Sequence, residues 1–146
     1  MPNALFIEIR REPIDTGHSI LKHRLQHTGN YQNWWSVPVP GMDALLKKSP
    51  EEQVLEQIWR TYRHIASMKE KFGQASFHVV KYGDLTKQPE STLQKIHQFF
   101  HQHGVDCKAD FRYLPEARKK NRIVEIDQSM YRALQLKSRD YNLDDL

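Results

Sequence analysis

Residues 6–24 decide the fold of this chain, and they read FIEIRREPIDTGHSILKHR. Residues 4–10 are almost continuously apolar and β-branched, which predicts a short strand buried on both faces of a parallel sheet. Pro13 then interrupts regular structure, and Asp15 or Thr16 can cap a helix that runs to about His27. A strand followed directly by a helix is the repeating unit of α/β proteins.

The rest of the chain continues this α/β pattern. Residues 49–52, SPEE, form a capping box that begins a long helix, which we expect to end at Gly73. A second strand is predicted at 77–82, a helix at 89–104 and a last helix at 127–138. Strands connected through helices favour parallel pairing, so we expect an α/β fold with a short parallel sheet flanked by helices.

The composition indicates one folded domain spanning residues 1–146. The chain is 38% hydrophobic and 10% aromatic, which excludes a disordered protein, and it has no apolar run near the roughly 20 residues of a membrane span. A single cysteine, Cys107, excludes an internal disulfide, and the first residues lack the pattern of a signal peptide, so the expected location is cytoplasmic. The net charge of +4 fits an anionic partner, but the basic residues are dispersed, which argues against nucleic acid.

The turn after the first strand carries the main functional hypothesis. In an open α/β sheet, ligands bind at the carboxyl ends of the strands. Here that end offers Arg11, a helix N-terminus and the hydroxyl of Ser19, which together can bind a phosphate. The alternative is structural: Arg11 covers a sheet edge and Ser19 is an ordinary serine within a helix.

A family resemblance rests on this same turn. Arg11, Pro13, Asp15 and Ser19 match an R-x-P-x-D-x-x-x-S pattern, and residues 6–24 resemble the 3′-phosphate-binding segment of sulfotransferases that use 3′-phosphoadenylyl sulfate (PAPS). The resemblance implies that Arg11 and Ser19 bind the 3′-phosphate of PAPS or of its product PAP.

A second stretch, residues 77–100, resembles the strand, Y-E-D-L turn and helix of the same family. The positions in register are Tyr82, Asp84, Leu85, Pro89, Leu93, Ile96 and Phe99, while Gly83 replaces the usual glutamate. The resemblance covers residues 4–104 and implies a partial P-loop-NTPase-like sulfotransferase fold.

The resemblance is to the C-terminal half of these enzymes. The half that carries the 5′-phosphosulfate loop, with its lysine, and the acceptor-activating base is not found in this sequence. We therefore assign no catalytic residue, and we do not expect sulfuryl transfer by this chain alone.

Three further residues are candidate cofactor contacts. Trp59 lies in the long helix and can stack on the adenine, although its helical spacing also fits a core residue. Arg118 and Lys119 fall where many family members have an R-K-G loop, but this sequence lacks the glycine, so a solvated basic surface is the alternative.

No metal site is expected. His97 and His101 are four residues apart on one helix, but neither an H-E-x-x-H pattern nor a cysteine pair accompanies them.

Two functions therefore remain open. One is a sulfotransferase-like protein that binds the 3′-phosphoadenosine part of PAPS or PAP and works with a complementing N-terminal chain. The other is a non-catalytic sulfotransferase-like module that forms a homo-oligomer or binds a protein partner through exposed apolar surface.

Overall fold

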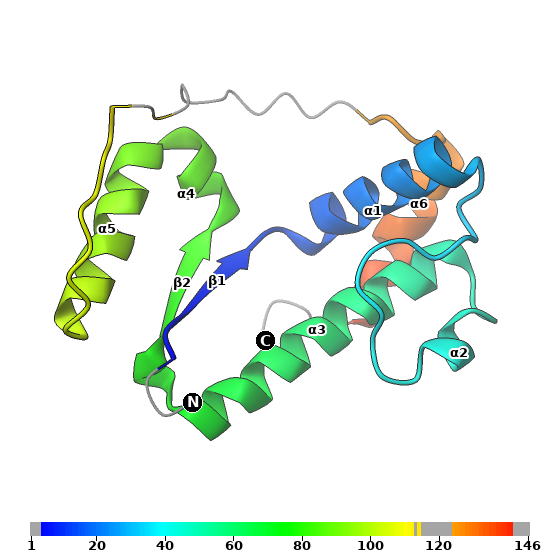
Figure 1. Ribbon diagram of the computed structural model, residues 1–146. Helices are drawn as coiled ribbons and strands as arrows, with labels where there is room; N and C mark the ends of the chain where they lie inside the picture. The colour runs from blue at the N-terminus through cyan, green and yellow to red at the C-terminus, as the bar shows by residue number, and fades with distance from the viewer. Residues whose placement is uncertain (1–3, 113, 115–123, 142–146) are drawn as a thin grey trace. The chain divides into compact units, whose positions relative to one another are not determined.

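The computed structural model describes residues 4–112, 114 and 124–141 (Figure 1). The chain divides into two compact units: unit 1 comprises Met1–Arg11 and Met68–Asn121, and unit 2 comprises Glu12–Ser67 and Arg122–Leu146. In the described ranges no helix is both long and apolar enough to cross a membrane. The assignment of residues 1–146 to one domain stays a prediction.

Unit 1 is built on a parallel pair of strands. Strand β1 (Phe6–Arg10) pairs with β2 (Phe77–Lys81) in a register that runs from Phe6 opposite Phe77 to Arg10 opposite Lys81 (Figure 1). The predicted parallel pairing is therefore confirmed. Within the described residues the sheet has these two strands, so each strand has one unpaired edge.

Aromatic rings pack on both sides of this sheet. The rings of Phe6 and Phe77 stack with 4.6 Å between centroids, and Phe72 lies 5.4 Å from Phe6. His78 points to the other side, because side chains alternate along a strand, and it stacks at 5.3 Å on Phe99 of α5 (Pro89–Gln102).

Helix α4 (Tyr82–Lys87) was not predicted. The short 3-10 turn η1 (Gln74–Ser76) leads into β2, and α4 begins directly after β2. Helix α4 packs against α5. Its six residues, YGDLTK, are too few to show a helical period, which is why the sequence pattern did not reveal it.

Unit 2 holds the main apolar core. Its elements are α1 (Pro13–Thr28), α2 (Met42–Leu45), the first part of α3 (Pro50–Phe72), α6 (Gln128–Lys137) and the 3-10 turn η2 (Ser138–Asp140). The buried core residues are Leu21, Val54, Leu55, Ile58, Ile126 and Leu134. Helices α1 and α6 lie side by side, and a Cβ added to Gly17 would come within 3.1 Å of Leu134, so glycine permits this close approach (Figure 1).

The helix starts show one confirmed prediction and one error. At α3 the Glu52 side chain reaches back to Ser49 as the capping box predicts: the backbone N–H and the hydroxyl of Ser49 both donate to Glu52 Oε2, at 3.3 and 2.9 Å. At α1 the prediction of a cap at Asp15 or Thr16 is wrong, because Pro13 is the first helical residue. Proline is tolerated there since the first helical N–H has no partner within the helix.

Candidate functional site at the carboxyl edge of the sheet

Two residues meet at the carboxyl edge of the sheet in unit 1. Arg11 follows the last residue of β1 and Tyr82 follows the last residue of β2, and the parallel register brings both to the same edge. The guanidinium carbon of Arg11 lies 4.9 Å from the centroid of the Tyr82 ring, which is a cation–π contact. The sequence pointed to Tyr82 only as part of the Y-E-D-L-like turn. Its contact with Arg11 follows from position, because each residue comes directly after one of two parallel strands that pair in register.

The charges near this edge are partly balanced from within the sheet. Glu8 is buried and pairs with Arg10 Nε at 2.6 Å and with Lys69 Nζ at 2.5 Å. Burial raises the pKa of Glu8, but the hydrogen bonds from Lys69 and Arg10 outweigh burial and hold the pKa below its usual value. Arg11 and Lys81 add two further positive charges at the same edge, which is a favourable electrostatic setting for an anion.

Ser19 lies in unit 2, in the second turn of α1, and its side chain is half-buried. Nearby on the same helix, His18 Nε2 accepts a hydrogen bond from the backbone N–H of Glu125 at 3.1 Å, and Lys22 pairs with the Glu125 carboxylate at 2.6 Å. The boundary between the units falls between Arg11 and Glu12. The binding of one phosphate by Arg11 and Ser19 together stays a prediction.

Trp59 packs against the core of unit 2. The guanidinium of Arg63 lies over its ring, 4.7 Å from the ring centroid. The tryptophan is half-buried, so its contact with an adenine stays a prediction. Arg118 and Lys119 lie outside the described residues.

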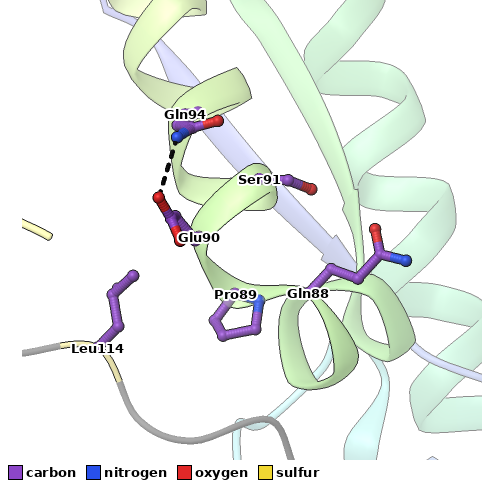
Figure 2. Close-up of a pocket in the computed structure, with 6 residues that line it drawn as sticks. All are labelled: Gln88, Pro89, Glu90, Ser91, Gln94 and Leu114. Carbon is purple, nitrogen blue, oxygen red and sulfur yellow. Dashed lines mark hydrogen bonds between the residues drawn. The ribbon is translucent and has the colours of Figure 1, made fainter.

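A pocket in unit 1 has none of the described predicted site residues in its lining. It has a volume of about 470 Å³ and is lined by Gln88, Pro89, Glu90, Ser91, Gln94 and Leu114. Figure 2 shows the hydrogen bond between Gln94 and Glu90 (3.3 Å) at the start of α5, with Leu114 facing them from the other side. A carboxylate in the lining disfavours a phosphate, so we do not assign the nucleotide to this pocket.

One member of the histidine pair on α5, His97, has a hydrogen bond to the backbone. His97 Nε2 lies 2.8 Å from the backbone carbonyl oxygen of Cys107, which it reaches as a hydrogen-bond donor. Among the described residues, no group of three or more His, Cys, Asp or Glu side chains is arranged to hold a metal ion.

Comparison with known proteins identifies the class to which this fold and edge belong. A family model described as "Sulfotransferase family" matches residues 1–104, which is more than two thirds of the chain. No curated protein and no solved structure matches the chain. The chain therefore belongs to the sulfotransferase family, and Arg11, Ser19 and Trp59 all lie inside the matched region.

Proposed function

We propose that this chain binds the 3′-phosphoadenosine part of PAPS or PAP, with Arg11 and Ser19 on the 3′-phosphate. The observation that carries the proposal is the position of Arg11, at the carboxyl edge of a parallel sheet in a chain of the sulfotransferase family. This edge is where α/β sheets bind ligands, and a guanidinium can bind two phosphate oxygens at once. Trp59, Arg118 and Lys119 are further candidate contacts to the nucleotide.

Sulfuryl transfer makes demands that nucleotide binding alone does not meet. A positive charge must stabilise the leaving 5′-phosphate at the oxygen that was bonded to sulfur, and a base must take the proton of the acceptor hydroxyl or amine. We assign neither role to a residue of this chain, so the proposal includes a complementing chain that supplies the 5′-phosphosulfate loop.

Calorimetric titration tests the nucleotide proposal. PAP should bind the wild-type chain more tightly than adenosine 5′-phosphate, and Arg11→Ala should remove most of that difference. Ser19→Ala should weaken PAP binding by about tenfold, the loss expected for one hydrogen bond to a charged group.

The chain offers matched controls for both variants. Arg132→Ala removes an exposed arginine of α6, and Ser67→Ala removes a hydroxyl that donates to the His64 carbonyl within its own helix. Neither control should change PAP affinity. A folded wild-type chain that binds PAP and adenosine 5′-phosphate equally, or binds neither, would contradict the proposal.

The exposed apolar residues of the sheet support a second candidate, a non-catalytic module that self-associates. Ile9 of β1 is 53% exposed and Val79 of β2 is 43% exposed, and each strand has an unpaired edge within the described sheet. Light scattering should then show mass rising with concentration, and Ile9→Lys or Val79→Lys should abolish the rise. Val105→Lys, at an exposed apolar position outside the sheet, is the control. A monomer at every concentration would exclude this candidate.

A further inference from the structure

Arg24 is a positive charge in the interior of unit 2. It lies on α1 with none of its surface exposed. Its Nη1 donates to the backbone carbonyl of Tyr31 at 3.1 Å and to Oε1 of Gln53 at 2.7 Å, and both of these acceptors are neutral. Fully buried arginines are normally paired with a carboxylate, and no ion pair to Arg24 occurs among the described residues.

The rest of this guanidinium has no hydrogen-bond partner. Arg24 Nε and Nη2 are both buried and unpartnered within the described structure, and so is Nε1 of Trp34. The Trp34 ring lies beside the guanidinium, with 5.1 Å between its centroid and Arg24 Cζ. Three nitrogen donors on these two neighbouring side chains are thus buried without an acceptor.

The unpartnered edge of the Arg24 guanidinium has the donor geometry of an oxyanion receptor. Nε and Nη2 form one edge of the guanidinium, and their parallel N–H bonds can donate to two oxygens of a single carboxylate, sulfate or phosphate group. Burial lowers the pKa of Arg24 to about 10, so the side chain still carries its charge at neutral pH. A buried charge without a counter-ion is costly, and an anion at this edge would remove much of that cost.

The segment 31–48 covers this part of α1 and α3. It is held in part by side chains of α3: Gln53 Nε2 donates to the Lys48 carbonyl at 3.0 Å, and Gln57 Nε2 donates to the Val37 carbonyl at 3.0 Å. Trp35 and Val37 in this segment are exposed. Because Arg24 is fully buried, access of an anion to it requires local opening of this surface segment.

We propose that Arg24 and Trp34 form an oxyanion-binding site inside unit 2, in which the Nε–Nη2 edge of Arg24 binds two oxygens of the ligand and Trp34 Nε1 donates a third hydrogen bond. The ligand is a small molecule that carries a carboxylate, sulfate or phosphate group. This proposal does not depend on the nucleotide proposal, because it uses none of the same residues.

Thermal unfolding of the full chain in millimolar sodium phosphate, sulfate or acetate tests the site, with sodium chloride at equal ionic strength as reference. At least one oxyanion should raise the unfolding midpoint in a saturable manner, because a ligand that binds only the folded state stabilises it. Comparison of the three salts identifies the preferred anion. General salt effects on the protein surface should be equal in the variants and so cancel from the comparison.

Three variants locate the effect. Arg24→Met should abolish the oxyanion-dependent shift. Arg24→Lys keeps the charge but lacks the two-donor edge, and it should weaken binding by at least about tenfold. Trp34→Phe keeps the ring beside Arg24 but loses the N–H, and it should weaken binding by about tenfold.

Two controls separate this site from other sources of the shift. Arg63→Met removes an exposed arginine that also lies over a tryptophan, and it should keep the full shift. Arg11→Ala should also keep it; a shift that disappears in Arg11→Ala belongs to the sheet edge instead. Equal midpoints in oxyanion and chloride for the wild type, or an undiminished shift in Arg24→Met and Arg24→Lys, would overturn the proposal.

Discussion

Glu8 and Lys69 form an ion pair in unit 1, with 2.5 Å between Oε2 and Nζ, and the side chains are 3% and 15% exposed. The other carboxylate oxygen of Glu8 accepts from Arg10 Nε at 2.6 Å. Glu8 can therefore be buried in the strand although it is charged, because it has two cationic partners. This arrangement also makes Glu8 a point at which unit 1 can be destabilised.

Replacement of Glu8 by glutamine should destabilise the chain. The variant keeps the size of the side chain but leaves Lys69 and Arg10 without their negative partner, and the loss for a buried pair is about 3–5 kcal/mol. Urea unfolding measures the difference. Glu125→Gln is the matched control, because its pair with Lys22 is exposed and should contribute little. An equal effect of both variants would contradict the argument.

The contribution of Glu8 should also depend on pH. Its pKa in the folded chain lies below the usual value of 4.5, since hydrogen bonds from Lys69 and Arg10 outweigh burial, which raises it. A lowered pKa means that the stabilisation is fully present above about pH 4.5 and is lost as the pH falls through the folded-state pKa. The difference in unfolding free energy between wild type and Glu8→Gln should therefore be constant near neutral pH and decrease in acid. A difference that stays constant into acid would contradict this assignment.

Two glycines offer a matched pair for backbone strain. Gly29 ends α1 with φ of 69°, and a Cβ at this position would contact nothing within 4 Å, so Gly29→Ala should cost about 1 kcal/mol from backbone strain alone. Gly83 has equal space but lies within α4 without a positive φ. Gly83→Ala should leave stability unchanged or raise it by a few tenths of a kcal/mol. Urea unfolding of both variants tests whether the positive φ of Gly29 causes its loss of stability, because the two sites have equal space. Equal changes in the two variants would contradict that explanation.

The sequence predicted those parts of the fold that depend on local signals. The Ser49–Glu52 capping box is such a signal, and Gly73, which directly follows the last residue of α3, is another. The pairing of Glu8 with Lys69 could not be predicted, because Lys69 is distant in the sequence and only the fold brings the two residues together. Helix α4 was missed because it is too short to show a period.

For the candidate site, too, only the features that depend on local sequence could be predicted. The position of Arg11 at the end of a strand follows from the local pattern, and parallel pairing then places it beside the end of β2. Arg24 could not be singled out, since a charged residue on a helix is normally expected at the surface. Its burial depends on Trp34 and Gln53, which come from two later parts of the chain.

The contact between Arg11 and Tyr82 leads to a prediction about nucleotide affinity, which rests on the proposed function. The ring lies 4.9 Å from the guanidinium carbon and should favour one orientation of Arg11. Tyr82→Phe keeps the aromatic face and should preserve the preference for PAP over adenosine 5′-phosphate. Tyr82→Leu should reduce PAP affinity by about 2–5-fold, the size of a cation–π contact at an accessible site, and should leave adenosine 5′-phosphate affinity unchanged. Equal losses for both nucleotides would mean that Tyr82 acts on another part of the ligand and not through Arg11.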